Sequence, residues 1–550
     1  MTELSIFVDI DSISDETRIR APRIDSCAPR IMDNLRSTGR LDDTKSVRSP
    51  ARRAASHPAA SRSSAMNDTL ASSAAVPPSR LARPTRRELL RIGLGGFSAL
   101  GLDDVLRLRA QASAATTSAA STGKQRTAVI LVWMRGGASH IETFDPKPHA
   151  PSDYRGPFSP IDTNVAGIRI CELLPRLAKM ADRYALVRSI THSSGGHFGG
   201  SRRMLSGDFN PPDSESRTPR APCWMTVANA LRGRERRTLP RYVGVNPVEK
   251  YDGFPIAGPD FLGHSFSVFP VLGDPSKPDF ALLEMGAQSQ EKRTRIQNRM
   301  DLRSALEGLR GELDVAGAME SHDHFMNQAV DLMLSPQARA AFDLTQEPDA
   351  VRERYGMHQW GQQCLLARRL VEAGVEIITT QLDGPLCGRV NNWDDHAVNH
   401  HVFDALQYRM PYVDQAVSTL INDIYERGLD RRVLVVLAGE FGRSPRINPN
   451  VSTGGGIGSG AAGTRQPGRD HWPQAGSVLL AGGGIRTGQV IGATDYKGEA
   501  PTEGRLGPED LLATIYSHLG FDPQSATLHD ASGRPLPILA SGAVIPGLKS

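Results

Sequence analysis

Carboxylate and imidazole side chains recur beside three apolar runs of the chain, at residues 375–380, 433–437 and 477–481. Nitrogen and oxygen donors of this kind are typical ligands of divalent metal ions. The sequence therefore predicts a metal centre that is assembled from segments far apart along the chain. Its first candidate ligands are Asp394, His396, Glu440 and His471.

The apolar runs have the length and composition of buried β-strands. The run at 433–437 is unbroken and rich in valine, which is typical of a parallel strand covered on both faces. Gly439 and Gly442 follow it and bracket Glu440 in a tight bend. Because open α/β sheets bind ligands outside the carboxyl ends of their strands, we expect Glu440 to lie at the ligand-binding edge.

Further strands are predicted at 127–134, 185–190 and 241–245, and helices at 173–184, 224–231, 359–373, 403–427 and 508–519. Strands that alternate with helices form parallel sheets. The predicted fold is therefore α/β, with a doubly wound, mostly parallel sheet and helices on both faces. The domain is predicted to span 127–550, with surface insertions near 208–270 and 291–334.

Two glycine-containing segments follow the first two strands and offer more polar groups. Residues 135–145 contain His140 and Asp145, which could be metal ligands, substrate contacts or turn residues. Residues 191–200 contain two histidines and two serines, and their glycines would let the backbone approach an anion closely. These side chains are His192, Ser193, Ser194 and His197.

The charge distribution argues against a nucleic-acid partner. The formal net charge is +4, but residues 1–126 hold 20 Lys and Arg against 13 Asp and Glu, which leaves 44 against 47 for the rest. A nucleic-acid surface needs basic residues clustered on the folded part. Five cysteines occur without a C-x-x-C pair, and buried small hydrophobic roles are favoured over disulfides for them.

The N-terminal region resembles an exported protein's leader. Residues 1–84 are rich in Ser, Ala, Arg and Pro and are predicted to be disordered. Residues 85–115 resemble a twin-arginine signal, with the pair Arg86 and Arg87 before an apolar run too short to span a bilayer. We expect export to the periplasm or beyond, no transmembrane span in the mature body, and a true start that could be Met66.

Five ordered motifs together resemble one protein family. They are R-R-E-L-L, G-G-A-S-H-I-E-T-F-D-P-K, W-D-D-H, A-G-E-F-G-R-S-P-R and G-R-D-H-W-P, and the resemblance they carry covers roughly Thr85 to Asp522. The chain is similar to the DUF1501 family of exported, sulfatase-like bacterial proteins in the alkaline phosphatase superfamily. This resemblance implies a doubly wound sheet that holds one or two divalent ions, with zinc, calcium or manganese as candidates, and that cleaves phosphate or sulfate esters.

The resemblance also implies roles for single residues. Glu440 matches a metal-binding acid, while Phe441 stands where the superfamily has a metal-binding histidine. Asp394, His396 and His471 match further ligands. The acidic ligand that normally ends the first strand is replaced by Arg135, so Asp145 or His140 would have to substitute for it.

The nucleophile is left open by the sequence. His197 lies near the position of the superfamily's nucleophile, but the body contains no C-x-P-S-R or C-x-A-S-R motif, so a formylglycine sulfatase is not expected. The candidates are Ser193, Ser194, His197 and a metal-bound hydroxide. Arg443 could bind substrate oxygens through its planar fork of N–H groups.

Three functions are compatible with these features. The first is an exported metal-dependent hydrolase that acts on a phosphate or sulfate ester of a small molecule or glycan. The alternative is a metal- or glycan-binding protein that kept the fold and lost the chemistry, as Phe441 and Arg135 would indicate. A third, structural role would use the charged helices predicted at 291–334 to dock other exported proteins.

Overall fold

A computed structural model describes residues 126–549 apart from 215–216, 218, 234, 236, 279, 281–331, 333–334, 385, 387–391, 455–457 and 531. The predictions of a disordered leader and a signal segment therefore lie outside the described residues, and so do the charged helices predicted at 291–334 except for Leu332. Within the described residues, no helix is both long and apolar enough to cross a membrane.

The centre of the fold is a sheet of eight strands in the order β16-β4-β15-β10-β1-β9-β5-β8. All neighbouring strands in it are parallel except at β15, which runs antiparallel to both β10 and β4. The predicted α/β fold with a mostly parallel sheet is confirmed. The strands are β1 (Ala128–Trp133), β4 (Tyr184–Ile190), β5 (Tyr242–Val245), β8 (Phe269–Val271), β9 (Ile377–Gln381), β10 (Val433–Ala438), β15 (Gly476–Gly482) and β16 (Gln489–Ile491).

The central strands are apolar throughout because both of their faces are covered. Every residue of β1 and β10 is buried. Alternate side chains point to opposite faces of a strand, so Ile130 and Val435 join one core while Val129 and Leu434 join the other. The paired register places Ile130 opposite Val435.

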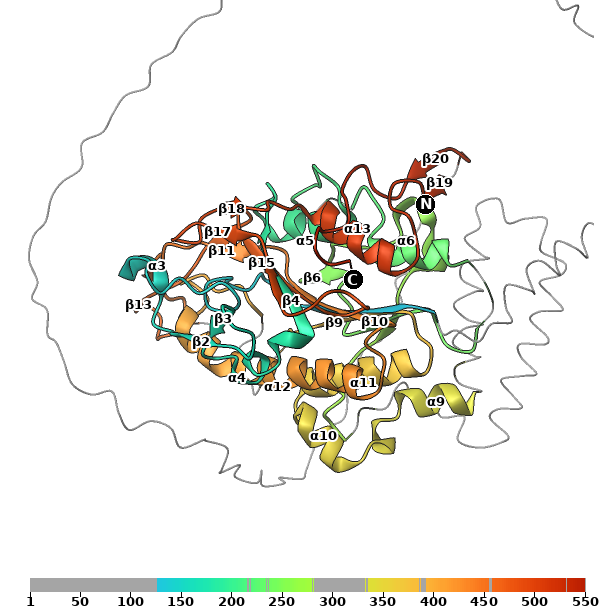
Figure 1. Ribbon diagram of the computed structural model, residues 1–550, viewed down its shortest axis with the longest axis horizontal. Coiled ribbons are helices and arrows are strands. Elements are labelled where there is room, and N and C mark those ends of the chain that lie inside the picture. The colour runs from blue at the N-terminus through green and yellow to red at the C-terminus, as the bar shows by residue number, and fades with distance from the viewer. Residues whose placement is uncertain are drawn as a thin grey trace, which may run out of the picture. The chain divides into compact units, whose positions relative to one another are not determined.

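Helices cover both faces of the sheet, as Figure 1 shows. One core packs between the sheet and the helices α4 (Pro175–Ala178), α9 (Pro336–Phe342), α10 (Asp349–Tyr355), α11 (Gln359–Glu372) and α12 (Val402–Glu426). The other core packs against α5 (His197–Ser206), α6 (Trp224–Leu231) and α13 (Pro508–His518). This two-sided cover is the predicted doubly wound arrangement.

Short elements outside the main sheet complete the domain. Two of them border the site described below: β11 (Gly442–Arg443) pairs with β14 (His471–Trp472), and β6 (Lys250–Tyr251) pairs with β7 (Phe254–Pro255). The others are α3 (Ser152–Arg155), β2 (Pro160–Asp162), β3 (Arg169–Cys171), β12 (Asn450–Val451), β13 (Arg465–Gln466), β17 (Ala493–Thr494), β18 (Pro501–Glu503), β19 (Thr527–His529) and β20 (Pro535–Pro537).

Two predicted segments differ from the structure. The helix expected at 173–184 is reduced to the four residues of α4, since a short 3-10 turn and then β4 follow it. The range 208–270, expected to be a surface insertion, contributes α6 and two strands of the main sheet, and Trp224 and Val243 are buried. The helix predicted at 224–231 and the strand predicted at 241–245 are confirmed, but they belong to the main fold rather than to an insertion.

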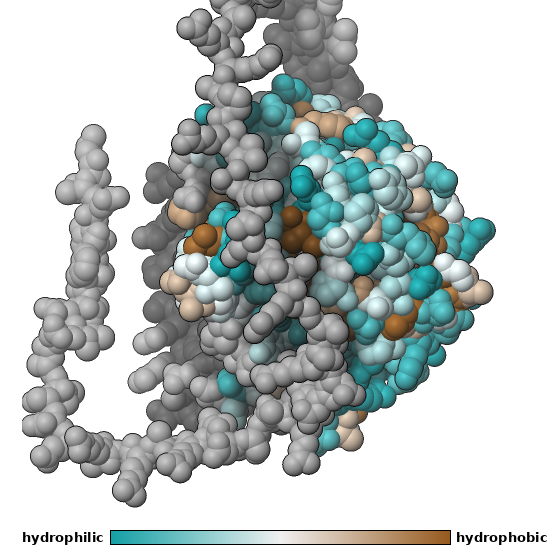
Figure 2. Space-filling view, turned by 90° about the vertical axis from the view of Figure 1, so that its left-hand side faces the viewer, coloured by the Kyte–Doolittle hydropathy of each residue, from teal (hydrophilic) through white to brown (hydrophobic). Residues whose placement is uncertain are grey.

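Three cysteines lie in the core of the fold. Cys171, Cys223 and Cys364 are buried and free, as expected for small core residues. Burial raises the pKa of the Cys171 thiol to about 12, so it is unreactive at neutral pH. On the face shown in Figure 2, hydrophobic residues form separate patches among hydrophilic ones.

Candidate metal centre

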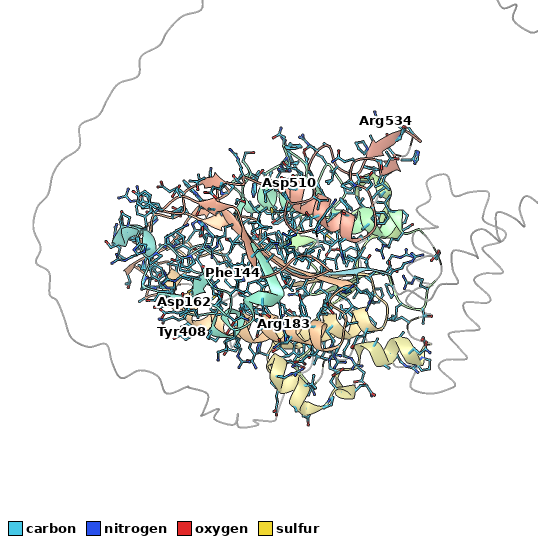
Figure 3. All side chains as sticks on the ribbon, in the orientation of Figure 1. Phe144, Asp162, Arg183, Tyr408, Asp510 and Arg534 are labelled. Carbon is cyan, nitrogen blue, oxygen red and sulfur yellow. The ribbon has the colours of Figure 1, made fainter. Side chains whose placement is uncertain are left out.

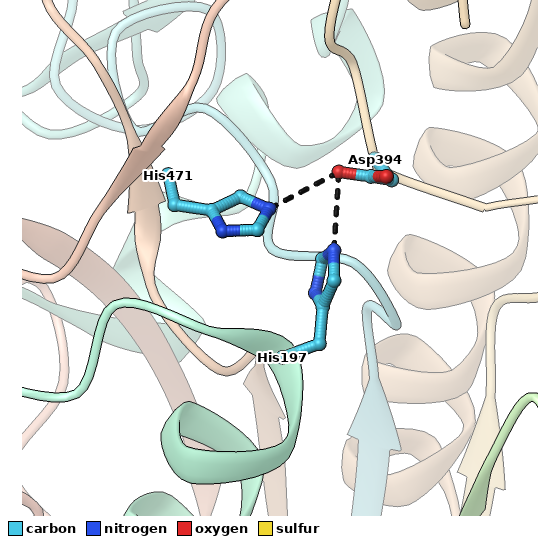
Figure 4. Close-up of side chains that lie close together, drawn as sticks. All are labelled: His197, Asp394 and His471. Atoms are coloured by element: carbon cyan, nitrogen blue, oxygen red, sulfur yellow. Dashed lines mark hydrogen bonds and ion pairs between the residues drawn. The ribbon is translucent and has the colours of Figure 1, made fainter. Parts of the chain in front are cut away.

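Three imidazoles converge on one carboxylate oxygen at the edge of the sheet. Asp394 Oδ1 lies 3.1 Å from His197 Nε2, 3.2 Å from His396 Nε2 and 3.3 Å from His471 Nε2. Figure 4 shows two of these rings pointing at the Asp394 carboxylate from different segments. Donor atoms of His197, Asp394 and His471 are close enough together to share one metal ion.

The direction of β15 explains how His471 reaches this edge. Asp394 follows β9, so it lies where the parallel strands end. His471 precedes β15, but β15 is antiparallel to β10, so its start lies at the end of β10. The same reversal lets β14 pair with β11, with Arg443 opposite His471. His197 reaches the cluster as the first residue of α5, directly after the loop that follows β4.

His396 lies between the cluster and a second carboxylate. Its Nδ1 is 2.8 Å from Asp470 Oδ1, while its Nε2 is 2.9 Å from His471 Nε2. His471 Nδ1 is in turn 2.7 Å from the Gly195 carbonyl oxygen, which the ring can only approach as an N–H donor. The Nε2 of His471 is therefore unprotonated, and its lone pair faces Asp394 and His396.

Glu440 holds His197 in place. Its side chain is fully buried, and Oε1 accepts a hydrogen bond from the Gly136 N–H at 2.7 Å. The same oxygen lies 2.9 Å from His197 Nδ1, so His197 has a carboxylate at each of its ring nitrogens. The other oxygen, Oε2, has no hydrogen-bond partner among the described residues, which is costly for a buried carboxylate unless a cation lies nearby.

Arg443 positions Asp394 rather than facing solvent. Its side chain has no exposed surface, and Nη2 donates to Asp394 Oδ1 at 2.7 Å and to the Gly136 carbonyl. Nε donates to the Gly137 carbonyl at 3.0 Å, and Nη1 donates to the Arg469 carbonyl at 3.1 Å. Protein acceptors thus occupy four of its five N–H groups, which leaves little of the guanidinium for substrate oxygens.

Tyr251 is a site residue that the sequence analysis missed. Its ring stacks on His197 with centroids 4.4 Å apart and planes 18° apart. The Arg135 guanidinium lies 4.1 Å from the centroid of the same ring and pairs with Asp383 at 2.6 Å and with Asp252. Arg135 therefore occupies the end of β1 as part of a stack that supports His197. No local pattern distinguishes Tyr251, since its role depends on a contact 54 residues away in the chain.

The electrostatics of the cluster separate its groups into charged and neutral ones. Burial opposes ionisation of Asp394, but the hydrogen bond from His197 and the Arg443 charge hold its pKa far below the usual range. Burial likewise opposes protonation of His197, but its two carboxylate partners raise its pKa above the ordinary value. For His471 burial dominates and lowers the pKa, which keeps its lone pair available.

Two of the predicted ligands lie apart from this cluster. His140 is buried, with Nε2 2.8 Å from the Gly498 carbonyl oxygen, and burial lowers its pKa. Asp145 pairs with Lys147 at 3.0 Å and lies 3.7 Å from Arg188. Neither contacts Asp394 or the three imidazoles in the described structure, so the substitution expected for the missing first-strand acid is not seen.

The two candidate serines border the cluster without bonding to it. Ser193 is exposed and Ser194 is half-buried. Their neighbour His192 donates from Nε2 to the Glu440 carbonyl at 2.7 Å and accepts the Ser194 backbone N–H at Nδ1, 3.2 Å away. Both ring nitrogens are thus occupied, and burial lowers the pKa of His192 to about 4. The geometry gives neither hydroxyl a histidine base among the described residues.

The donor set fits a divalent ion. Tetrahedral ligands at about 2.1 Å from zinc lie about 3.4 Å from one another, close to the 3.1 and 3.3 Å that separate Asp394 Oδ1 from His197 Nε2 and His471 Nε2. Two imidazoles and a carboxylate are the nitrogen and oxygen donors that such ions take. His396 is backed by Asp470 in the manner of carboxylate–histidine pairs beside metal sites.

Gly136 packs closely against the backbone of Asp394. It has φ +107°, and a Cβ added there would lie 2.6 Å from the Asp394 backbone nitrogen. We expect Gly136→Ala to displace Asp394 and to weaken metal binding at least about 10-fold, as loss of a supporting contact does.

Gly167→Ala is the matched control, because Gly167 has φ +82° but nothing within 4 Å. It should cost only the strain of a left-handed residue, about 1–2 kcal/mol, and leave metal affinity unchanged. Calorimetric metal titration and urea unfolding measure both effects, and equal metal affinities in the two variants would contradict the packing argument.

The fold and the cluster together define an α/β protein with a histidine–carboxylate site at the carboxyl edge of a mostly parallel sheet. The chain belongs to the family described as "Protein of unknown function (DUF1501)", which matches residues 126–548. No curated protein matches the chain.

Several solved structures are similar to the chain at low sequence identity. The 2-O GAG sulfatase BT1596 is 10% identical, with 77% of this chain and 73% of that chain covered and a TM-score of 0.33. The PsFucS1 sulfatase from Pseudoalteromonas sp. is 9% identical, with 75% and 71% covered and a TM-score of 0.30. The phosphonate monoester hydrolase of Agrobacterium radiobacter is 10% identical, with 77% of each chain covered and a TM-score of 0.30.

Proposed function

We propose that this protein is a metal-dependent hydrolase of phosphate or sulfate esters. The observation that carries the proposal is the convergence of His197, His396 and His471 on Asp394 Oδ1. A divalent ion held by His197, Asp394 and His471 would polarise an ester oxygen and lower the pKa of water. The sequence motifs that resemble the alkaline phosphatase superfamily support the same reaction class.

The residues around the cluster would orient its donors. Glu440 fixes the ring of His197 through Nδ1, and the Gly195 carbonyl fixes His471 through Nδ1, so both rings present Nε2 to the centre. Arg443 fixes Asp394 in turn. Fixed rotamers and tautomers of this kind are what keep catalytic groups close to the productive geometry.

Phe441 supports a centre with one ion rather than two. Its ring lies 4.6 Å from the His471 ring and 5.5 Å from the His197 ring, centroid to centroid, and only 6% of the residue is exposed. An apolar ring excludes water on this side of the cluster and offers no donor to a second ion. The same substitution is the observation that favours the second candidate function, a protein that binds metal or a glycan without turnover.

We propose water as the nucleophile, because the hydroxyl groups of Ser193 and Ser194 are not hydrogen-bonded to a histidine in the described structure. We further propose export by the twin-arginine route, which the pair Arg86 and Arg87 supports. That route carries folded proteins, which suits a protein that takes up its ion before export.

The test combines elemental analysis with turnover. The full chain should purify with about one divalent ion and hydrolyse at least one of p-nitrophenyl phosphate, its diester, p-nitrophenyl sulfate or a phenylphosphonate ester. A chelator should abolish turnover and the ion should restore it. His471→Ala should weaken metal binding by more than about 100-fold, since it removes a ligand and not merely a supporting group. His529→Ala, at an exposed position of β19, is the matched control and should behave as wild type.

The outcomes separate the candidates. Bound metal without turnover on any ester would contradict the hydrolase and favour the binding protein. A well-folded wild type without metal would contradict the hydrolase and favour a glycan-binding protein on the same fold. Ser193→Ala and Ser194→Ala should each keep turnover within a few-fold, and loss of turnover with retained metal in either variant would contradict water as the nucleophile.

A further inference from the structure

A cavity of about 580 Å³ lies beside the first turn of α13, where Asp510 is labelled in Figure 3. Its volume falls within the range of about 300–1,000 Å³ that is usual for small-molecule sites. The walls come from the loop after β4, from α5 and the residues that follow it, from Gln474 and from the start of α13. The function proposed above assigns no role to this cavity.

The cavity adjoins the metal cluster through two chain segments. Ser193 lines the cavity, and two residues later the Gly195 carbonyl binds His471. Gln474 also lines it and follows His471 by three residues, so their Cα atoms are at most about 11 Å apart. The His192 N–H donates to the Pro473 carbonyl at 2.9 Å and joins the two segments. The cavity and the metal cluster are therefore built from neighbouring residues of the same two segments.

Both acidic side chains of the cavity lining have bonding partners. Glu509 pairs with Arg203, which also donates to the Gly207 carbonyl at 2.8 Å. Asp510 accepts the backbone N–H groups of Gly507 and Ala543, each at 2.9 Å. Arg505 is exposed and has no hydrogen bond or ion pair with any residue in the described part of the chain. Its guanidinium is therefore available to an anionic ligand in the cavity.

The remaining lining suits a hydroxylated ring. Phe209 is 50% exposed, and the Arg203 guanidinium covers one side of its ring at 4.3 Å from the centroid. The exposed aromatic surface can pack against the C–H face of a sugar. Ser193 and Gln474 are both exposed and add a hydroxyl and an amide that can bond to sugar hydroxyl groups.

We propose that this cavity is a subsite for an acidic sugar, with the ring against Phe209 and the carboxylate toward Arg505. The inference rests on the proposed function for its link to catalysis, since it identifies the substrate as a glycan whose ester group reaches the metal cluster. Binding in the cavity itself does not require turnover.

The test uses the full chain and uronic-acid-containing disaccharides as probes, with their neutral glucosyl counterparts as controls for charge. Titration calorimetry should detect the acidic disaccharides and should show that Arg505→Gln weakens them at least 10-fold without changing the weaker neutral ones. Phe209→Ala should weaken both sets, and Phe209→Trp should restore them. Arg534→Gln, at an exposed arginine of the distant β20 hairpin labelled in Figure 3, should change nothing.

Failure of the subsite and failure of the hydrolase give different results. His471→Ala should keep disaccharide binding, because it alters the metal cluster only. Ester turnover without binding of any acidic disaccharide at millimolar concentration would overturn the subsite and leave the hydrolase standing. Binding that is equal in wild type, Arg505→Gln and Phe209→Ala would also overturn it. Binding with these effects but without turnover supports the subsite on a non-catalytic protein.

Discussion

Replacing Asp394 with asparagine will abolish stoichiometric metal binding and lower turnover by about 1,000-fold, which corresponds to about 4 kcal/mol. Asp394 Oδ1 is the atom on which three imidazoles and Arg443 converge, and a neutral amide is a far weaker ligand than a carboxylate. The amide keeps the size of the side chain and can still accept a hydrogen bond from Arg443, so the fold should be retained. Elemental analysis, ester turnover and near-UV circular dichroism measure the three effects.

Asp404→Asn is the matched control for this substitution. Asp404 lies in the first turn of α12, with 58% of its side chain exposed, and contacts none of the cluster. It should keep both metal and turnover. A folded Asp394→Asn protein that binds metal as tightly as wild type would show that the ion lies elsewhere.

Replacing Arg443 with alanine will lower the free energy of unfolding by about 3–5 kcal/mol, as expected when one partner of a buried ion pair is removed. The change leaves Asp394 without its cation and the carbonyl groups of Gly136, Gly137 and Arg469 without their donor. Urea unfolding measures the loss. Arg446→Ala is the control, because that side chain is 74% exposed and pairs with Asp153 only at 3.4 Å, so the change should stay within about 0.5 kcal/mol.

The Arg443 variants also separate a positioning role from substrate contact. Arg443→Lys keeps the charge but not the fork of N–H groups, so it should be intermediate in stability and in metal affinity. An Arg443→Ala protein as stable as wild type, with a raised KM and full metal content, would instead support contact with substrate oxygens.

The sequence was sufficient for the sheet and for most of the cluster, because both depend on local patterns. Buried strands such as 433–438 are unbroken apolar runs, and polar residues beside them meet at one edge. The structure brings three of the predicted ligands, Asp394, His396 and His471, into contact, and Glu440 reaches them through His197, while their role in metal binding stays a prediction. For His197 the sequence left a nucleophile, a metal ligand and an anion contact open, and the structure places its Nε2 beside Asp394.

The remaining features depend on long-range packing. Tyr251 lies in the two-residue strand β6, and its stacking on His197 is a tertiary contact that no pattern along the chain specifies. The antiparallel direction of β15 could have been predicted from the sequence. No helix is expected between 446 and 476, and a parallel strand would have needed a crossover connection. His140 and Asp145 follow a strand end as the ligands do, but a pattern along the chain does not specify which way a turn side chain points.

The reversal at β15 also has a consequence for when the site can exist. The backbone of Gly136 and the imidazole of His471 meet around Asp394 although most of the domain separates them in sequence. Closing loops of this length is slow, because the chain loses conformational entropy before the stabilising contacts form. During synthesis the centre cannot be completed until the last sheet strands have emerged. The ion would then bind late, after the domain has folded. An ion that binds only the folded state would shift the folding equilibrium toward that state.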